Sequence, residues 1–276
     1  MKFIDLFAGI GGIKIAFENA DFQCVFSNDF DVYAKITFDL NFSEIFETEK
    51  QMMLGDIKKI PASKIPDFDI LCGGFPCQPF SIAGYKQGFN DEKDRGNLFF
   101  DIVRILKAKK PKAFLLENVK NLKTHDKGNT LKVILEKLEK ELGYFVKVKV
   151  LNTMKYGNLP QNRERIYIVG FLNKKAHDKF SFPEKVKLTK TIHDCLEEKD
   201  VDDKYYYNDK PLYKDLKNDV KKKDTVYQWR RKYVRENKNN VCPTLTANMG
   251  MGGHNAPLVL NEKGIRKLTP RECANF

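Results

Sequence analysis

Short apolar runs alternate with amphipathic segments along the first two thirds of the chain. Over 130–142 the apolar residues recur at helical spacing, and Gly143 is placed to end that helix. Shorter helices are predicted at 13–17, 33–40 and 98–106. The predicted strands are residues 2–8, 24–27, 68–72, 113–116, 144–150 and 166–169. This alternation predicts an α/β fold with a doubly wound, mostly parallel sheet.

The alternation stops near Phe171. From there to about residue 265 lysines and tyrosines cluster, and a glycine-rich segment spans 250–253. We therefore expect a larger first domain at 1–171 and a second, smaller domain at 172–265.

The last residues begin a helix that the chain does not continue. Thr269 suits the helix N-cap, Pro270 the first helical position, and Glu272 completes a capping box. The chain stops at Phe276, and a helix of barely one turn is unstable by itself because its first turn is costly. We therefore expect the polypeptide to be incomplete as a functional unit.

The charge balance is strongly basic, with a formal net charge of +12. Such a balance favours a polyanionic partner, nucleic acid first. The six cysteines have no paired metal-ligand spacing, so we predict no metal site and a reduced, cytoplasmic protein. No apolar run reaches the length of a membrane span, and no membrane partner is expected.

A glycine-rich turn follows the first predicted strand. It reads Gly9-Ile10-Gly11-Gly12, and Asp29 lies about twenty residues further on, after the second strand. This order of strand, turn, helix, strand and acid is typical of a site for a nucleoside-bearing cofactor. The dinucleotide fingerprint requires a glycine where Lys14 stands, so an adenosine cofactor is favoured over a nicotinamide one.

A cysteine follows the strand at 68–72, in a loop that reads Gly73-Gly74-Phe75-Pro76-Cys77-Gln78. Pro76 fixes its own φ and restricts the residue before it, so the backbone is stiff just ahead of the thiol. In an open α/β sheet, ligands bind at the carboxyl ends of the strands. Cys77 is therefore a candidate nucleophile, although a lone cysteine is more often a small buried hydrophobe.

Four strand-end motifs and one motif near the C-terminus occur in a fixed order. They are Phe7-Ala8-Gly9-Ile10-Gly11-Gly12, Pro76-Cys77-Gln78, Glu117-Asn118-Val119, Gln161-Asn162-Arg163-Glu164-Arg165 and Arg266-Lys267-Leu268-Thr269-Pro270-Arg271-Glu272. Each motif is modest alone, but the ordered set closely resembles the cytosine-5 DNA methyltransferases of bacterial restriction–modification systems. The resemblance covers nearly the whole chain and is weakest in 172–240.

The resemblance implies a Rossmann-like, S-adenosylmethionine-dependent methyltransferase fold, with a catalytic and cofactor-binding domain at 1–171 and a DNA-recognition domain at 172–265. It also implies that 266–276 is the truncated start of a segment that returns to the catalytic domain, completed in the functional unit by lost residues or by a second polypeptide. It implies transfer of a methyl group to C5 of a flipped-out cytosine in a specific double-stranded DNA sequence, with S-adenosylhomocysteine as product. Cys77 would add to C6 of the base, which makes C5 nucleophilic. Glu117 would engage N3, for which it must hold or share a proton. Arg163 and Arg165 would orient the nucleophile loop and hold the O2 of the base.

The resemblance also assigns binding residues. The cofactor would contact Phe7, Ala8, Gly9, Gly11, Gly12, Asp29, Phe30, Asp56, Ile57, Pro76 and Leu98. For Ile57 and Leu98, plain core packing is nearly as strong an interpretation. A loop at 73–90 would close over the duplex, and the DNA contacts there would be Gln78, Ser81, Lys86 and, just after the loop, Arg95. In the second domain the DNA contacts would be Arg230, Arg231, Thr244, Leu245, Gly252 and Gly253.

Three other functions stay open. A tRNA cytosine-5 methyltransferase would keep the chemistry, but the long 172–265 region argues for a DNA-reading domain. A tail-less, inactive subunit that binds DNA and needs a partner chain is a second alternative, although Cys77, Glu117 and Arg165 are all present. A nicotinamide oxidoreductase is disfavoured by Lys14 and leaves Cys77 without a role.

Overall fold

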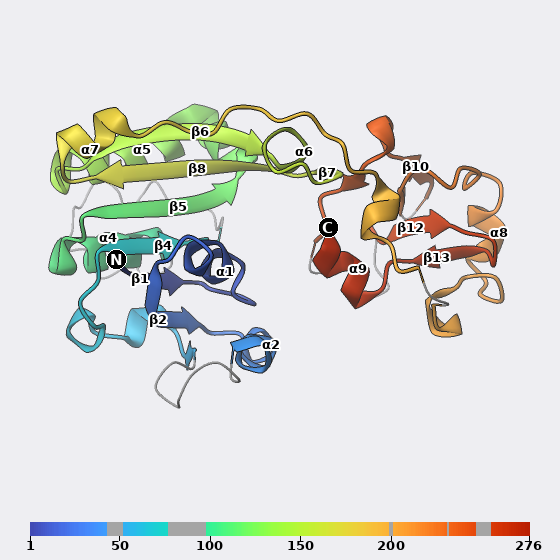
Figure 1. The fold of residues 1–276 in the computed structure, drawn as a ribbon, viewed down its shortest axis with the longest axis horizontal. Helices are drawn as coiled ribbons and strands as arrows, with labels where there is room; N and C mark the ends of the chain where they lie inside the picture. The colour runs from blue at the N-terminus through green and yellow to red at the C-terminus, as the bar shows by residue number, and fades with distance from the viewer. Residues whose placement is uncertain (43–51, 77–97, 199–200, 231, 247–254) are drawn as a thin grey trace. The chain divides into compact units, whose positions relative to one another are not determined.

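The computed structural model describes residues 1–42, 52–76, 98–198, 201–230, 232–246 and 255–276 (Figure 1). The chain forms two compact units. Unit 1 comprises Met1–Val150 and Arg165–Phe182, and unit 2 comprises Leu151–Glu164 and Pro183–Phe276. The chain therefore passes from one unit to the other three times, at residues 150/151, 164/165 and 182/183.

Unit 1 is organised around a seven-stranded sheet in the order β3-β2-β1-β4-β5-β8-β6. Its strands are β1 (Lys2–Leu6), β2 (Gln23–Asp29), β3 (Met53–Leu54), β4 (Ile70–Gly73), β5 (Ala113–Val119), β6 (Phe145–Asn152) and β8 (Glu164–Phe171). The pairs from β3 to β5 are all parallel, and β5 pairs antiparallel with β8. The predicted α/β fold with a mostly parallel sheet is confirmed.

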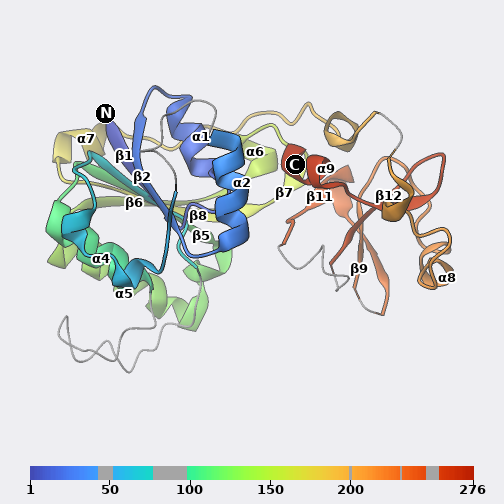
Figure 2. The same ribbon diagram turned by 90° about the horizontal axis from the view of Figure 1, so that it is seen from below.

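Helices cover both faces of this sheet, as Figure 2 shows. On one face α4 and α5 pack on the larger apolar cluster, and on the other face α1 packs on Phe3, Cys24 and Cys72. The helices of unit 1 are α1 (Gly12–Glu18), α2 (Val32–Phe42), α4 (Leu98–Lys109), α5 (Asn129–Glu136) and α7 (Lys174–Lys179). A π-helical turn at Lys137–Glu141 extends α5, and Gly143 then adopts φ +76°, as expected of the residue that ends a helix. This arrangement is the doubly wound one that the alternation predicts.

The strand order reverses between β1 and β4. Helix α1 leads from β1 to β2 on one side, whereas β4 lies on the other side of β1 and pairs Gly73 with Leu6. The glycine turn after β1 and the loop that leads to Cys77 after β4 therefore leave the sheet from neighbouring strands. Such a reversal point is where open α/β sheets bind ligands.

Unit 2 has a four-stranded antiparallel sheet, in the order β10-β9-β12-β13, and a separate two-stranded parallel pair of β7 with β11. The strands are β7 (Gln161–Asn162), β9 (Tyr227–Trp229), β10 (Val234–Glu236), β11 (Cys242–Pro243), β12 (Pro257–Leu260) and β13 (Ile265–Lys267). Its helices are α6 (Thr153–Tyr156), α8 (Tyr213–Leu216) and α9 (Pro270–Asn275). Two small apolar clusters form its core.

The short helix α9 is held by tertiary contacts. Thr269 and Glu272 form the predicted capping box, and Glu272 is completely buried. Arg266 of β13 donates to both carboxylate oxygens of Glu272 at 2.7 Å, and the backbone N–H of Glu197 donates to the same carboxylate. A bidentate, charge-assisted pair of this kind explains how so short a helix is retained.

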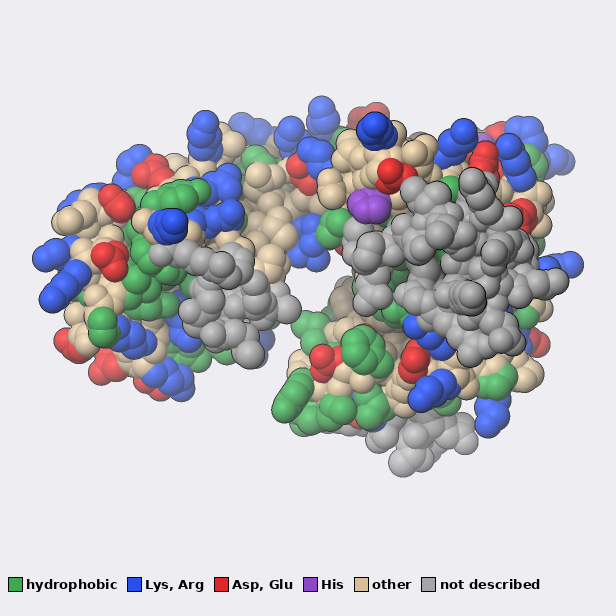
Figure 3. Space-filling model, turned by 180° about the vertical axis from the view of Figure 1, so that it is seen from behind, with side chains coloured by type: hydrophobic (Ala, Val, Ile, Leu, Met, Phe, Trp, Pro, Cys, Tyr) green, Lys and Arg blue, Asp and Glu red, His purple; other side chains and the backbone are tan. Residues whose placement is uncertain are grey.

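Lys and Arg side chains are distributed over both units on the face seen in Figure 3. Large apolar side chains are exposed on and beside α2, among them Phe30, Tyr33 and Leu40. Within the parts of the chain that the structure describes, no helix is long and apolar enough to cross a membrane.

Candidate active site

The glycine turn after β1 has the backbone that its sequence requires. Phe7, Gly9 and Gly11 all have positive φ, and Gly11 lies at +91° directly before α1. A Cβ atom on Gly11 would collide with the ring of Phe42, whereas Cβ atoms on Gly9 and Gly12 would meet nothing within 4 Å. The turn is thus packed against α2 on one side and borders open space on the other.

Asp29 fastens this turn to the end of β2. One of its carboxylate oxygens accepts the backbone N–H of Gly9 at 2.8 Å, and the other accepts the N–H of Asp31 at 2.9 Å. The side chain is only 9 % exposed, but the following Phe30 is 70 % exposed. Asp29, the acid predicted from the sequence, therefore holds the backbone of the turn, and the ring of the adjacent Phe30 is exposed.

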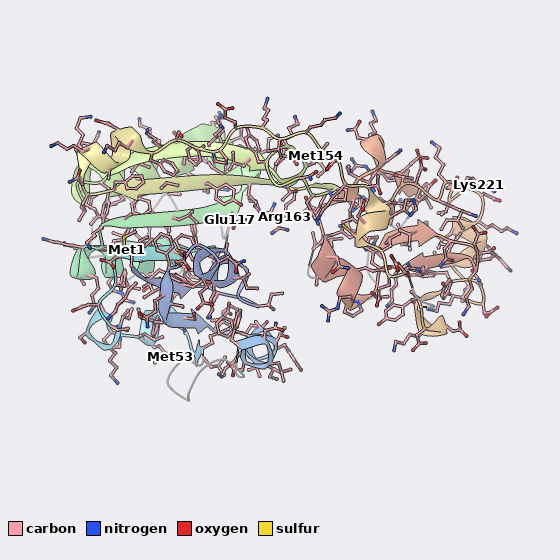
Figure 4. The ribbon with its side chains drawn as sticks, in the orientation of Figure 1. Met1, Met53, Glu117, Met154, Arg163 and Lys221 are labelled. Atoms are coloured by element: carbon pink, nitrogen blue, oxygen red, sulfur yellow. The ribbon has the colours of Figure 1, made fainter. Side chains whose placement is uncertain are left out.

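Glu117 and Arg165 meet at the other strand ends. Glu117 is near the carboxyl end of β5, as labelled in Figure 4, and Arg165 is at the start of the antiparallel neighbour β8. Arg165 Nε lies 2.8 Å from Glu117 Oε1, with both side chains largely buried. The remaining oxygen, Oε2, lies 3.3 Å from the point where a Cβ atom on Gly74 would be. Residue 74 must be small for the cysteine loop to pass this carboxylate so closely.

Asn118 ties the cysteine loop to β5. Its side-chain amide donates to the carbonyl oxygen of Phe75 at 2.9 Å, and its own oxygen accepts the N–H of Val119 at 2.8 Å. Asn118 is 3 % exposed and Phe75 is 2 % exposed, so this hydrogen bond is sheltered from water. The backbone two residues before Cys77 is therefore fixed beside Glu117.

The other predicted cofactor residues described by the structure lie at the same edge of the sheet. Asp56 caps the short 3-10 helix Ile57–Lys59 that follows β3, by accepting the N–H of Lys58 at 3.1 Å. Ile57 is 2 % exposed and belongs to the large apolar cluster, and Leu98 packs against that cluster. Pro76 is exposed at the last described position before Cys77, and Ala8 donates its N–H to Asn28.

The described cysteines are all poor candidates for a nucleophile. Burial raises the pKa of Cys24 and Cys72 in unit 1, and of Cys195 and Cys242 in unit 2. Burial also raises the pKa of Cys273, to about 11. A thiol must ionise to act as a nucleophile, and burial opposes ionisation of each described cysteine. By elimination, Cys77 is the remaining candidate.

Three of the predicted residues of unit 2 take part in hydrogen bonds within that unit. Arg163 lies between β7 and β8, where its carbonyl accepts the N–H of Thr153. Arg230 donates to Asn255 at 2.6 Å, and Thr244 donates its hydroxyl to the carbonyl of Asn162 at 2.8 Å. Leu245 packs on one of the apolar clusters. Arg163 belongs to a different unit from Glu117, and its predicted role with Arg165 remains a prediction.

Several predictions fall outside the described residues. They concern Cys77, Gln78, Ser81, Lys86, Arg95, Arg231, Gly252 and Gly253. Within the described residues, no group of three or more His, Cys, Asp or Glu side chains is placed to hold a metal ion.

Sequence reasoning did not single out Asp5, which is buried in β1 between Ser27 of β2 and Cys72 of β4. Neither carboxylate oxygen makes a well-formed hydrogen bond within the described residues. Burial raises the pKa of Asp5 to about 7, and the charge of Asp29 adds to this, whereas the backbone amide and ammonium of Lys14 partly offset it. The signal in the sequence was a charge in the middle of an apolar strand.

Comparison with known proteins identifies the family. The family model of the C-5 cytosine-specific DNA methylases matches residues 1–276. This chain belongs to that family, and it is a DNA (cytosine-5-)-methyltransferase. Enzymes of this family in general use S-adenosylmethionine as methyl donor.

Two curated relatives match nearly all of the chain. The Type II methyltransferase M.Bsp6I of Bacillus sp. (strain RFL6) is 52% identical over 280 residues, which cover 100% of this chain and 86% of that protein. The Type II methyltransferase M.HaeII of Haemophilus aegyptius is 48% identical over 274 residues, which cover 98% of this chain and 80% of that protein. These matches do not favour the tRNA enzyme or the inactive subunit, and they give no support for a second polypeptide.

Solved structures share the fold at lower identity. The S. pombe Dnmt2 methyltransferase superposes with a TM-score of 0.69 at 19% identity, covering 99% of this chain and 85% of that one. A putative DNA modification methyltransferase encoded within an E. coli prophage superposes with a TM-score of 0.66 at 20% identity, covering 100% of this chain and 87% of that one. The Rossmann-like methyltransferase fold is thereby confirmed.

Proposed function

We propose that this protein transfers a methyl group from S-adenosylmethionine to C5 of a flipped-out cytosine within a specific DNA duplex, through a covalent bond between Cys77 and C6. The relatives named above are Type II methyltransferases, which favours a role in a restriction–modification system. We further propose that unit 2 reads the target sequence.

The observation that carries this proposal is the closeness of the cysteine loop to Glu117. Asn118 binds the loop backbone at Phe75, and Gly74 lies against Oε2, the carboxylate oxygen that does not face Arg165 Nε. A nucleophile for C6 and an acid for N3 must act on the same small ring at the same time. The loop base and the carboxylate leave the sheet from the adjacent parallel strands β4 and β5, which suits that requirement.

Each side chain has a defined task in this reaction. The Cys77 thiolate adds to C6 while Glu117 gives or shares a proton at N3, so that electron density moves to C5. Arg165 orients the carboxylate through its 2.8 Å ion pair, which leaves the second oxygen for the base. After transfer, water takes the C5 proton, the sulfur–C6 bond breaks to release the Cys77 thiolate, and the N3 proton returns to Glu117, which together restore the aromatic ring.

The residues at the edge of the sheet suit an adenosine cofactor. Gly9 and Gly12 border open space beside the turn, and Phe30 presents an exposed aromatic face next to Asp29. Phe7, Ala8, Gly11, Asp56, Ile57, Pro76 and Leu98 would complete the pocket. The bound S-adenosylmethionine supplies an electrophilic methyl group.

The direct test is methyl transfer from labelled S-adenosylmethionine to unmethylated genomic DNA, followed by sequencing that locates 5-methylcytosine. We expect methylation at C5 of one cytosine in a defined short sequence. Methylation at a ring nitrogen, or at cytosines without sequence preference, would contradict the proposal.

The covalent step has its own test. DNA that contains 5-fluorocytosine at the target should form a stable protein–DNA adduct in the presence of cofactor, because fluorine cannot leave C5 as a proton does. The adduct should appear as a mass shift on the peptide that contains Cys77. An active enzyme that never gives this adduct would exclude attack at C6 by the thiolate.

A further inference from the structure

The segment 53–60 carries two of the residues proposed to face the adenine, Asp56 and Ile57, yet it has little regular structure. Strand β3 contains only Met53 and Leu54, at the edge of the sheet, and the 3-10 helix after it is a single turn. Met53 is labelled at this edge in Figure 4. So short a segment needs other contacts to hold its shape.

Asn28 of β2 fixes the first half of the segment. Its side-chain amide donates to the carbonyl oxygens of Met53 and Gly55, both at 2.9 Å. The N–H of Gly55 in turn donates to the carbonyl of Asp29 at 2.9 Å. Asn28 is 1 % exposed, so these hydrogen bonds are sheltered and connect the segment directly to the strand that ends at Asp29.

Arg104 of α4 fixes the second half. Its guanidinium donates to the carbonyl oxygens of Ile57 at 2.9 Å and Ile60 at 3.0 Å. Asp101, one turn earlier on α4, accepts from Nε and Nη2 of the same guanidinium at 3.3 and 3.1 Å. Only the planar fork of an arginine can reach two separate carbonyls and a carboxylate together.

We propose that Asn28 and Arg104 are positioning residues for the cofactor, with Asp101 bracing Arg104. They touch neither the base nor the methyl group, and act by holding the backbone carbonyls on both sides of Asp56. This proposal rests on the proposed function, because it takes Asp29, Phe30, Asp56 and Ile57 as the adenosine-binding residues. It predicts that weakening either contact loosens cofactor binding and leaves the chemistry at Cys77 intact.

The test uses Arg104→Lys, which keeps the charge but loses the fork, and Asn28→Ser, which loses both amide donors. Lys109→Ala is the matched control, since Lys109 lies on the same helix and, among the described residues, its ion pair is with the exposed Asp67 at 2.9 Å. Binding of S-adenosylhomocysteine is measured by calorimetry, and the KM for S-adenosylmethionine, the KM for DNA and kcat are measured separately.

We expect Arg104→Lys and Asn28→Ser to raise the Kd of S-adenosylhomocysteine and the KM for S-adenosylmethionine by about tenfold, the loss expected for one or two ordered hydrogen bonds. The KM for DNA and kcat at saturating cofactor should change by less than about twofold, and Lys109→Ala should match the unmodified protein. A fall in kcat with an unchanged KM for cofactor would show that Arg104 and Asn28 only support the fold, and would overturn the proposal.

An Asp29→Ala variant tests the positioning role separately from the proposed function on which it rests, namely the proposed cofactor pocket. We expect that variant to lose cofactor binding more severely than either positioning variant. If Asp29→Ala binds S-adenosylhomocysteine normally, the proposed pocket itself is wrong. If Asp29→Ala loses binding while Arg104→Lys and Asn28→Ser keep it, the pocket stands and the positioning role is wrong.

Discussion

Units 1 and 2 are stabilised in different ways. In unit 1 an extended apolar cluster lies between the sheet and the helices, and the polar groups of interest gather at the strand ends. In unit 2 the strands have two to four residues, the apolar clusters are small, and a buried Arg266–Glu272 pair joins β13 to α9. In unit 1 the proposed chemistry lies at the strand ends beside a large apolar core, whereas in unit 2 a buried ion pair is itself part of a core with only small apolar clusters.

Because of this difference, a basic residue in unit 2 cannot be identified as a DNA contact from its charge alone. Arg266 is a basic residue in a basic chain, yet it is 2 % exposed and bound to Glu272 on both nitrogens of its fork. Arg230, a predicted DNA contact, likewise donates to Asn255. In unit 2, therefore, the hydrogen bonds and ion pairs of a positively charged residue within the protein must be known before DNA contact is inferred from its charge.

The strongest test of this contrast is Cys77→Ser. Because serine is a far weaker nucleophile, methyl transfer should fall by on the order of 10⁴-fold or more. The melting temperature and the DNA affinity should hardly change, because stability and target reading depend on other residues. Radiolabel transfer, thermal unfolding and a DNA-binding titration measure the three quantities, and substantial transfer by the variant would rule out the thiolate mechanism.

In unit 2 the corresponding test is Arg266→Met. Removing the arginine leaves the completely buried carboxylate of Glu272 without its counter-charge, which costs about 3–5 kcal/mol. Denaturant unfolding should show this loss. The Arg266→Met/Glu272→Leu double variant should recover most of it, since it leaves no unpaired charge.

The control for that experiment is Glu236→Gln. Glu236 forms a solvent-exposed pair with Lys222 at 2.7 Å, and loss of such a pair changes stability by less than about 1 kcal/mol. Equal effects of Arg266→Met and Glu236→Gln would contradict the view that buried charge holds unit 2 together.

Asp5 gives unit 1 a distinctive pH dependence. Its pKa rises from 3.8 in the unfolded chain to about 7 in the folded protein, so the folded state binds the proton more tightly. Stability should therefore fall as the pH rises from about 4 to above 7, by about 4 kcal/mol from this group. The Asp5→Asn variant should lose this slope, as followed by unfolding between pH 5 and 8. A variant with the slope of the unmodified protein would show that Asp5 is not its source.

Among the buried polar contacts tested, the smallest expected effect comes from Tyr144→Phe. The Tyr144 hydroxyl donates to the carbonyl of Pro111 at 2.9 Å in a buried site, so its loss should cost about 1–2 kcal/mol. Thermal unfolding would measure this cost. An effect as large as that of Arg266→Met would mean that the two units do not differ in their reliance on buried polar contacts.

Much of unit 1 could be predicted from the sequence because its signals are local. The glycine turn, the strand that ends at Asp29 and the helix that ends at Gly143 each depend on a few neighbouring residues. The capping box at Thr269 was predictable for the same reason. These elements are fixed by backbone geometry and by spacing of apolar positions, which can be read without knowing the fold.

What the sequence did not predict depends on pairing between distant segments. The contact of Glu117 with Arg165 exists because β8 runs antiparallel beside β5. The order of strands in a sheet cannot be predicted from the sequence of either strand alone. Arg104 reaches the carbonyls of Ile57 and Ile60 across more than forty residues. Its position in a helix that is otherwise largely apolar was the available signal, but its partners are backbone atoms, which leave no mark in the sequence.

The three chain crossings have a consequence for making chimeras. Residues 151–164 belong to unit 2 although 165–182 of unit 1 separate them from 183–276, and their strand β7 pairs with β11. A hybrid in which only 183–276 is exchanged with a relative would join β11 of one parent to β7 of the other. Transplanting the whole of unit 2 therefore requires exchanging both 151–164 and 183–276. Exchanging only 183–276 would leave a mismatched β7–β11 pair at Gln161 and Cys242.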